Sequence, residues 1–502
     1  MANYITRGMV DVEPTTDRKA MANKFTNMIY SVVNMIGKEP IYTTWITFQL
    51  GAGNSPIVFN TDTTNPTQNL IATLTFNKKG AGVTNDFEIV IQYDPFRMGQ
   101  ETTDIVEKLD EYVAKAMSMN YNTDTDVLKG IIQYGYNSTS DSNLVSPKYS
   151  FLIKSASSEV QYSSGLASYT FTGVSTIATD CDNAVSFGRI DNWKLMDIIL
   201  WVLFYWYGDD AHRPAHIDSK DKCKENDFKY RIDIPETVYQ EAVENVSVEP
   251  MSGMTPWEYC KSLLEEYPLT KAETQQTVYE DLSQLPYHQR PRYEMSLTDV
   301  DGVKTIHIAH IKPAAPTVEE NGKEVTAPVE ASDIQIPYQF SWGTQTKNIV
   351  VGWNPKVDLT TYLIRKARYK RFKDDLESAG GDEEAKAKIK EKMTSVDESV
   401  DEYYDAQLQL LGIPCDVPIG AELRIVPVVL ESISRTAGIY SVKSCTDVIS
   451  SNGLYVTTID LFRVRSLDDA TIVYKYVEPE VATDVFTSTV TNTGTTTNSS
   501  TK

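Results

Sequence analysis

The densest group of side chains that could hold a metal ion follows the most apolar stretch of the chain. It consists of Asp209, Asp210, His212, His216 and Asp218, which fall within ten residues. Carboxylate and imidazole groups are ligands that zinc uses in proteins. Pro214 stands between the two histidines, so no helix supports their spacing. The pattern leaves open a metal site and a polar loop after an apolar helix, and it favours the loop.

Other residues suited to nucleophilic or acid–base chemistry are scattered. His307 and His310 are three residues apart on an expected strand, which points their side chains to opposite faces. The sequence contains no GxSxG, GxxxxGKS/T or HExxH motif. A glycosidase needs only two carboxylates, which the 69 acidic residues do not exclude. We expect no catalytic residue, no cofactor-binding residue and no metal ligand.

The five cysteines are at least thirty residues apart, and their odd number includes no CxxC pair. They are Cys181, Cys223, Cys260, Cys415 and Cys445. This spacing disfavours a disulfide framework and a zinc ribbon, and it predicts assembly in a reducing cytoplasm.

One run of positive charge interrupts an otherwise acidic chain. It comprises Arg365, Lys366, Arg368, Lys370, Arg371 and Lys373, with Tyr369 and Phe372 between them. The run could bind nucleic acid, dock an acidic neighbouring subunit, or form a solvated helix face that pairs with nearby carboxylates. The candidate partner-docking residues are Arg365, Arg368, Lys370 and Arg371.

A heptad-like apolar pattern follows this run. Its members are Ile389, Met393, Val396, Val400, Tyr403 and Leu410. Steps of four and three residues are typical of a coiled-coil seam. We expect a helix–helix seam centred on Ile389, Met393, Val396 and Val400, packed either on the preceding helix or on a symmetry mate.

Alternation of apolar and polar residues predicts two regions of strands, because one face of each strand is then buried. The expected fold class is β-rich α+β, with two antiparallel β-barrels that each carry a helical insertion, separated by a small α+β domain. The regions are 1–37 (N-terminal arm and helix), 38–185 (first barrel), 186–333 (small domain plus linker), 334–465 (second barrel, helical insertion 359–411) and 466–502 (C-terminal extension with a Thr/Ser-rich tail).

Local signals place several elements. Thr255, Pro256 and Glu258 form a capping box that predicts a helix over 255–266. Asp104 with Glu107 is expected to cap a helix inserted in the first barrel. Further predictions are helices over 20–35 and 193–207, and hairpins over 160–177 and 292–311.

The charge balance limits the binding partners. The 502 residues include 69 acidic and 47 basic ones, a formal net charge of −22. A surface of this sign repels phosphate backbones, so we expect no stable nucleic-acid binding. Such a surface would suit a conduit that DNA must pass without sticking, and it also fits an ordinary acidic protein. The apolar stretch 198–207 is too short to cross about 30 Å of hydrocarbon as a helix, and the first residues lack the apolar core of a signal peptide.

The segment from Leu411 to Val464 carries a resemblance to a known family. It reads LGIPCDVPIGAELRIVPVV and then GIYSVKSCTDVISSNGLYVTTIDLFRV. This resembles the C-terminal barrel of the baseplate hub proteins of contractile phage tails and related injection systems. The matching positions are Gly438, Tyr440 and Val442, then Val442 to Ser450, then Thr457 to Arg463, with a hairpin turn at Asn452-Gly453.

The resemblance implies a function. In that family each subunit gives two similar barrels, and a homotrimer forms a ring of approximate sixfold symmetry in the baseplate of the virion tail. One side of the ring meets the hexameric tail tube and the other meets the trimeric spike, with a channel for DNA and the tape-measure protein. A baseplate wedge is a further expected partner, whereas catalysis and membrane insertion are not expected. The alternatives are another structural tail part (tube, wedge or adhesin) and a tail-associated cell-wall hydrolase.

Overall fold

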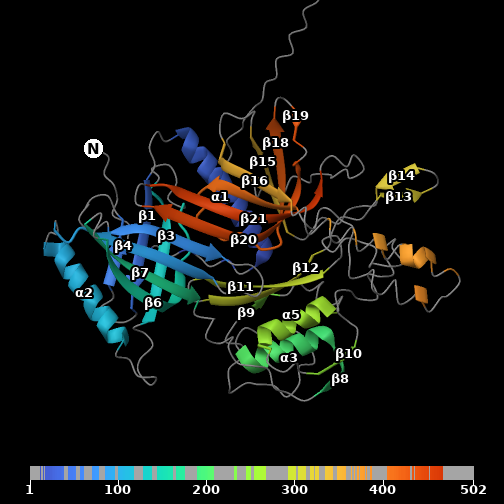
Figure 1. Cartoon of the computed structure of the whole chain (residues 1–502), viewed down its shortest axis with the longest axis horizontal. Helices are drawn as coiled ribbons and strands as arrows, with labels where there is room; N and C mark the ends of the chain where they lie inside the picture. The colour runs from blue at the N-terminus through green and yellow to red at the C-terminus, as the bar shows by residue number, and fades with distance from the viewer. Residues whose placement is uncertain are drawn as a thin grey trace, which may run out of the picture.

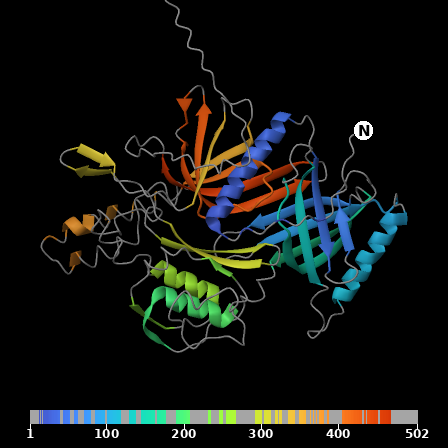
Figure 2. The same ribbon diagram turned by 180° about the vertical axis from the view of Figure 1, so that it is seen from behind.

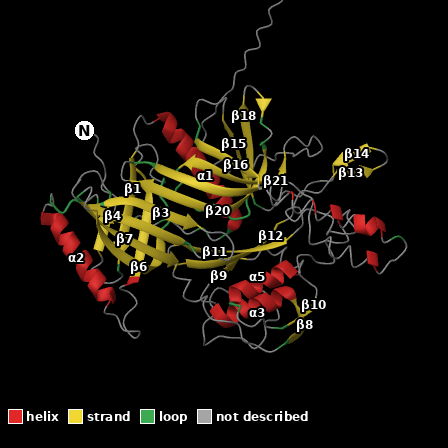
Figure 3. Ribbon diagram, viewed as in Figure 1, coloured by secondary structure: helices red, strands yellow, loops and turns green. Residues whose placement is uncertain are grey.

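The computed structural model of the chain is dominated by β-strands, with helices at the periphery (Figure 1, Figure 3). It describes residues 9, 12, 15, 17–38, 43–51, 57–61, 70–78, 85–96, 100–117, 128–137, 144–161, 165–175, 189–207, 231–233, 245–249, 254–266, 292–300, 303–311, 317–320, 323–326, 334–342, 348–357, 363, 367, 370–371, 374–378, 380, 385–386, 404–429, 432–434, 436–450 and 453–466.

The first group of strands, which we call the first β unit, lies in the N-terminal part of the chain. Its strands are β1 (Thr43–Leu50), β2 (Ile57–Asn60), β3 (Ile71–Lys78), β4 (Asp86–Tyr93), β5 (Lys129–Asn137), β6 (Tyr149–Gln161) and β7 (Leu166–Ser175). They pair antiparallel in the order β3-β4-β7-β6-β5-β1-β2. The predicted hairpin over 160–177 is confirmed as β6 and β7, with Gly165 in the left-handed conformation that its turn requires.

The second β unit is formed by the C-terminal strands. These are β15 (Gln335–Trp342), β16 (Val350–Val357), β17 (Tyr404–Leu411), β18 (Glu422–Val429), β19 (Ser432–Ile433), β20 (Gly438–Ser450) and β21 (Tyr455–Ser466). The predicted turn before β21 is supported by Gly453, whose φ of 85° suits a tight hairpin.

The two β units form one continuous sheet instead of two separate ones. Strand β20 pairs with β3, which joins the order β16-β17-β21-β20 to β3-β4-β7-β6. Among the described strands no pairing closes either unit into a ring, so barrel closure stays a prediction. One pair departs from the predicted antiparallel pattern, because β15 runs parallel to β18.

The main hydrophobic core lies on one face of this sheet and is covered by helix α1 (Arg18–Lys38). The predicted helix over 20–35 is confirmed. It begins after Asp17, whose Oδ1 accepts the Ala20 N–H at 2.7 Å, and it buries Phe25, Ile29 and Val32 at helical spacing. Figures 1 and 2 both show this N-terminal helix beside the C-terminal strands. The opposite ends of the sequence therefore share one core.

Helix α2 (Gln100–Met117) is the insertion expected in the first β unit, and Leu109 and Tyr112 anchor it in the core. The expected cap at Asp104 is wrong. The helix begins four residues earlier, at Gln100, so Asp104 lies in its second turn. An Asp three residues before a Glu occurs inside helices as well as at their starts, and the sequence pattern does not separate the two cases.

A smaller α+β region has its own core and lies below the large sheet in the view of Figure 1. It contains β8 (Ile190–Lys194), α3 (Leu195–Tyr207), β9 (Arg231–Asp233), β10 (Asn245–Val248), α5 (Pro256–Glu266), β11 (Arg292–Val300) and β12 (Val303–Ile311). The predicted hairpin over 292–311 is confirmed as β11 and β12. A further pair, β13 (Thr317–Glu320) and β14 (Lys323–Thr326), falls in the expected linker.

The capping box predicted for α5 is present. The Thr255 Oγ1 accepts the Glu258 N–H at 3.2 Å, and Glu258 Oε2 accepts the Thr255 N–H at 3.0 Å. Among the described helices, none is long and apolar enough to cross a membrane.

The predicted helical insertion over 359–411 is wrong at its C-terminal end. Residues Tyr404–Leu411 form strand β17, which pairs with β16 and β21. Ala406, Leu408 and Leu410 are buried at a spacing of two, whereas the heptad pattern had used Leu410 at a spacing of seven from Tyr403. Leu410 fits both the heptad period of a helix and the two-residue period of a strand. The segment forms a strand because it pairs with two neighbouring strands, β16 and β21.

Candidate functional site at the joint between the two β units

The site that links the two halves of the chain is the β3–β20 pairing, which we call the joint. Its register runs from Lys78 opposite Cys445 to Thr73 opposite Ser450. Because side chains alternate along a strand, one row at the joint points into the core and the next row points away from it. The two rows carry different chemistry.

The inward row contains a buried ion cluster around Lys78. Its Nζ lies 2.8 Å from Asp447 Oδ2 and 3.7 Å from Asp416 Oδ1, and it donates to the Cys415 carbonyl oxygen at 2.8 Å. Lys78 is 5% exposed and Asp447 is fully buried. The lysine comes from the first β unit and both carboxylates come from the second, so the ion pairs tie the units together.

Hydroxyl groups complete the cluster. Asp447 accepts hydrogen bonds from Tyr134 OH and Thr457 Oγ1, both at 2.6 Å. Asp416 accepts one from Tyr149 OH at 2.9 Å. The Lys78 ammonium also lies between 5.4 and 5.9 Å from the ring centres of Phe76, Tyr134 and Tyr149, within cation–π range. A buried charge is tolerable only when it is paired and hydrogen-bonded in this way.

Lys78, Tyr134 and Tyr149 keep their protons near neutral pH, because the pKa of each is raised. Burial by itself would lower the pKa of Lys78, but Asp447, Tyr149 and Asp416 offset that effect and hold this pKa well above its usual value. Burial, together with the nearby carboxylates, raises the pKa values of Tyr134 and Tyr149 well above their usual range. Burial likewise raises the pKa of the Cys415 thiol, which disfavours a thiolate nucleophile there.

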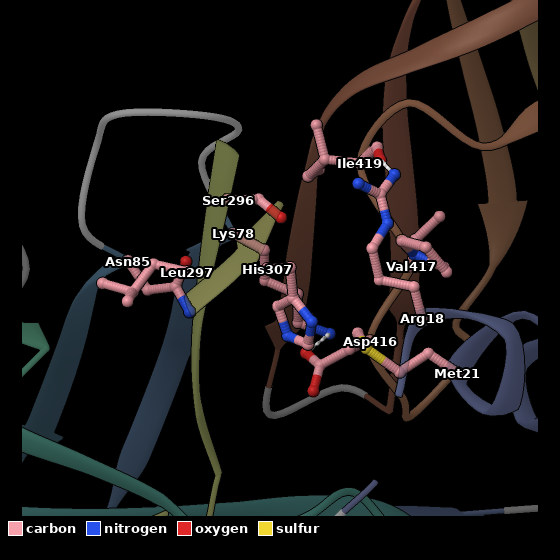
Figure 4. Close-up of a pocket in the computed structure, with 11 residues that line it drawn as sticks. Arg18, Met21, Lys78, Asn85, Ser296, Leu297, His307, Asp416, Val417 and Ile419 are labelled. Carbon is pink, nitrogen blue, oxygen red and sulfur yellow. Dashed lines mark hydrogen bonds and ion pairs between the residues drawn. The ribbon is translucent and has the colours of Figure 1, made fainter. Parts of the chain in front are cut away.

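A small cavity lies beside the cluster, where α1, β3, the β11–β12 hairpin and the 416–419 segment meet (Figure 4). Its volume of about 30 Å³ is lined by Arg18, Lys78, His307 and Asp416 among others. This is space for about one water molecule, whereas a pocket for an organic substrate is typically some 300–1,000 Å³. A cavity of this size beside the cluster is consistent with a role of the cluster in packing between the two units.

The outward row belongs to a second surface, which we call the outer face. It is formed by the core-averted side chains of β17, β21, β20, β3, β4 and β7, placed in rows by the register of the strands. Hydrogen bonds cross it from strand to strand. Asp460 accepts from Gln407 and Ser444, and Asn77 links Thr446 to Asp86.

Hydroxyl, amide and acidic groups dominate the outer face. Its described residues include Asp405, Gln407, Thr458, Asp460, Ser444, Thr446, Thr73, Thr75, Asn77, Asp86, Glu88, Gln92, Ser168, Thr170 and Thr172, and the apolar Val448, Val90, Val174, Val456 and Phe462. Among the described side chains of this face, Lys443 is the only basic one, and its Nζ lies 2.9 Å from Asp405 Oδ1. The face is therefore polar and net negative.

Most site residues predicted from the sequence belong neither to the ion cluster nor to the outer face. Lys370 and Arg371 are exposed and helical, while Arg365 and Arg368 lie outside the described residues. The same holds for the seam residues Ile389, Met393, Val396 and Val400, and for the metal candidates between Asp209 and Asp218. His307 is buried on β12. Within the described part of the chain, no group of His, Cys, Asp and Glu residues could hold a metal ion.

The ion cluster was missed because its members are far apart in the sequence. Lys78 and Cys415 are separated by 337 positions. From the sequence, a Lys at the end of an alternating strand is expected to be exposed to solvent. Lys78 is buried because its partners come from the other β unit, which the local sequence does not reveal. A weak signal existed in Asp447, which alternates with the apolar residues Cys445 and Ile449.

Comparisons with known proteins gave structural matches only. No family model matches the sequence, and no curated protein matches it. A tail protein from Neisseria meningitidis MC58 matches with a TM-score of 0.39 and 7% identity, covering 84% of this chain and 96% of that one. The 43 kDa tail protein of prophage MuSo2 from Shewanella oneidensis matches with a TM-score of 0.40 and 8% identity over the same shares. The E. coli c3393 protein matches with a TM-score of 0.36 and 9% identity, covering 78% of this chain and 73% of that one. That protein is described as a type VI secretion component with similarity to the T4 tail proteins gp27 and gp5.

Proposed function

We propose that this protein is a structural hub subunit of a contractile tail or a related injection machine. Three copies form a ring of approximate sixfold symmetry that joins a hexameric tube to a trimeric spike and leaves a channel for DNA. The resemblance of the segment from Leu411 to Val464 to baseplate hub proteins supports the family. The role is one of assembly, without a catalytic step.

The observation that carries the proposal is the sheet that runs unbroken through both β units. The β3–β20 pairing and the Lys78 cluster fix one unit against the other. Two β units held rigidly in one chain allow three chains to present six units. Such a chain can match a sixfold partner on one side and a threefold partner on the other, which is what a symmetry adapter between tube and spike needs.

The outer face suits the wall of a channel. A passing DNA duplex carries a dense row of phosphates, which bind where Lys and Arg side chains neutralise them. Glu88, Asp86 and Asp460 repel phosphates, and Lys443 is already held by Asp405. Rows of threonine and serine hydroxyls keep the wall wetted. Such a wall lets the polymer slide past without stable binding.

The basic run is the proposed contact for the spike, the wedge or another acidic neighbour. Its residues are Arg365, Arg368, Lys370 and Arg371, and the last two are exposed. The helix–helix seam of Ile389, Met393, Val396 and Val400 is proposed to support this docking segment. Charge reversal at Lys370 and Arg371 should then block assembly with the partner while the purified ring stays folded.

Electron microscopy of the purified protein tests the proposal. The expected particle is a ring with a central channel, threefold in detail and nearly sixfold in outline. Particles without a channel would overturn the hub assignment and favour a wedge or an adhesin, and stacked sixfold rings would indicate a tube protein. A cell-wall turbidity assay separates the remaining alternative, because a hydrolase clears the suspension and a hub does not.

A further inference from the structure

Lys78 and Asp447 hold an amine and a carboxyl group in contact inside the protein. Lys78 Nζ lies 2.8 Å from Asp447 Oδ2, and the carbon Cγ that carries this oxygen is no more than one bond farther away. The register fixes this approach, because Lys78 lies opposite Cys445 and Asp447 follows two residues later on the same face of β20. Two groups held at such a distance react as if one were present at about 10⁵–10⁸ M. The pair therefore has the geometry needed to form an amide bond.

A second carboxylate, that of Asp416, is placed to act as the base. Its Oδ1 lies 3.7 Å from Lys78 Nζ and accepts a hydrogen bond from Tyr149 OH at 2.9 Å. An ammonium group must lose a proton before its nitrogen can attack, and Asp416 can accept that proton while Asp447 serves as the acyl group. The proton stays within the cluster, so the transfer needs no exchange with solvent. The ion pair is the resting form, because the pKa of Lys78 is held well above its usual value, and amide formation is therefore slow.

The surroundings of the pair favour the loss of water. Lys78 is 5% exposed and Asp447 is fully buried, with the rings of Phe76 and Tyr134 within 6 Å of the ammonium. Keeping two opposite charges away from water costs free energy, and an amide removes both charges. The cavity of about 30 Å³ that Lys78 and Asp416 line has room for about one water molecule, so it can receive the water released (Figure 4).

Two hydroxyl groups are placed on the two oxygens of the Asp447 carboxyl group. Thr457 Oγ1 donates to Oδ1 and Tyr134 OH donates to Oδ2, both at 2.6 Å. Attack on Cγ moves negative charge onto a carboxyl oxygen, and a donor already aimed at that oxygen stabilises the charge. Thr457 thus stabilises the oxygen that remains in the amide, and Tyr134 lies beside the oxygen nearest to Lys78.

We propose that Lys78 and Asp447 form an isopeptide bond, which joins the two β units covalently through their side chains. Lys78 Nζ passes one proton to Asp416 and attacks Cγ of Asp447, so that a C–N bond forms. The Cγ–Oδ2 bond then breaks, and Oδ2 leaves as water with the proton from Asp416 and a second proton from Nζ. One ammonium and one carboxylate become one amide and one water molecule, and no oxidant or cofactor is consumed. The reaction occurs once per chain, and it rests on the cluster alone and not on the proposed function.

Mass spectrometry of the full chain tests the bond. The intact, unfolded protein should be lighter than its sequence by one water molecule, in a fraction that rises as the folded protein is incubated. Proteolysis should then release a branched peptide that joins the segments around Lys78 and Asp447. The internal control is the pair of Lys443 and Asp405, whose Nζ and Oδ1 lie 2.9 Å apart at the exposed surface. Water surrounds that pair, so the same digest should show it unlinked.

Two variants test the roles of the side chains. Lys78→Arg keeps the positive charge but lacks the nucleophilic amine, so it should retain its full mass. Asp416→Asn keeps the shape of the side chain but cannot take the proton, and it should slow formation of the bond about a hundredfold. Circular dichroism establishes that each variant is folded. If Lys78→Arg does not fold, the digest of the natural chain and Asp416→Asn still decide the question.

The outcomes are distinct. A linked peptide containing Lys78 and Asp447, formed more slowly in Asp416→Asn, supports the proposal. Full mass in the folded natural chain after prolonged incubation overturns it. A loss of water that maps to Asp301-Gly302, where an aspartate before a glycine can close to a cyclic imide, also overturns it. Equal rates in Asp416→Asn and the natural chain overturn the role given to Asp416.

Discussion

At the residue scale, Lys78 decides how the two halves of the molecule are held together. A lysine with 5% exposure needs compensation for its lost hydration, and Asp447, Asp416 and the Cys415 carbonyl supply it from the other β unit. The hydroxyls of Tyr134, Tyr149 and Thr457 then saturate the carboxylates. The arrangement favours one register of the joint, because a shift by one residue would turn Lys78 away from its partners.

We predict that Lys78→Met destabilises the protein by about 3–5 kcal/mol, because it leaves the buried Asp447 without its counter-ion. Urea unfolding followed by tryptophan fluorescence measures the loss. The control is Lys443→Met, which removes the exposed pair with Asp405 and should cost at most about 1 kcal/mol. Equal effects of the two substitutions would show that the cluster contributes nothing beyond a surface ion pair.

The cluster also predicts how stability depends on alkaline pH. Folding raises the pKa of Lys78, Tyr134 and Tyr149, so the folded state keeps protons that the unfolded state releases above about pH 10. Their contribution to stability is therefore complete below that pH and is lost as pH rises further. Urea unfolding between pH 8 and 11 should show this fall, with a shallower slope in Tyr149→Phe. A flat profile would contradict the buried titratable cluster.

At the element scale, local signals predicted helix α5 and the β11–β12 hairpin, whose partners lie close in the sequence, but the local cap expected at Asp104 was wrong. Thr255 and Glu258 cap α5, and the β11–β12 hairpin closes over a short turn. The strand β17 was missed because Leu410 fits a heptad as well as an alternating strand, and its neighbours β16 and β21 are distant in sequence. The pairing of β3 with β20 at the joint could not be predicted, because the sequence of β3 does not indicate which strand it pairs with.

The capping box gives a prediction for α5. Thr255→Ala should destabilise the small α+β region by about 1 kcal/mol, because the Glu258 N–H loses its acceptor. The matched control is Ser262→Ala in the same helix, whose hydroxyl bonds only to the carbonyl of Tyr259 within the helix and should matter little. Hydrogen exchange over residues 256–266 reads out the effect locally. Faster exchange in the control than in Thr255→Ala would refute the cap.

At the scale of the whole molecule, the outer face, which would form the wall of the proposed channel, is net negative. The outer face carries Asp86, Glu88, Asp405 and Asp460 against Lys443. The net charge of −22 could be read from the sequence, but which acidic residues share one sheet face required the strand order. The acidic composition alone is compatible both with a conduit and with an ordinary acidic surface. The proposal of a conduit therefore depends on the tertiary structure.

Charge inversion on this face should create DNA binding. Glu88→Lys with Gln92→Lys places two cations on the outer face of β4, and we expect it to retard a DNA duplex in a gel at low salt and to release it as salt rises. The control makes the same change in net charge on the exposed side of α2, by Glu107→Lys with Glu111→Gln. DNA binding by the control alone would place the channel elsewhere.

The most direct test of the hub assignment is the mass of the purified protein in solution by light scattering. The account predicts a stable species near three times the 56.4 kDa of one chain. A trimer is the smallest assembly in which two β units per chain give six around an axis. A hexamer would contradict the symmetry adapter and indicate a tube or ring component, and a chain that stays monomeric at every concentration would contradict the closed ring.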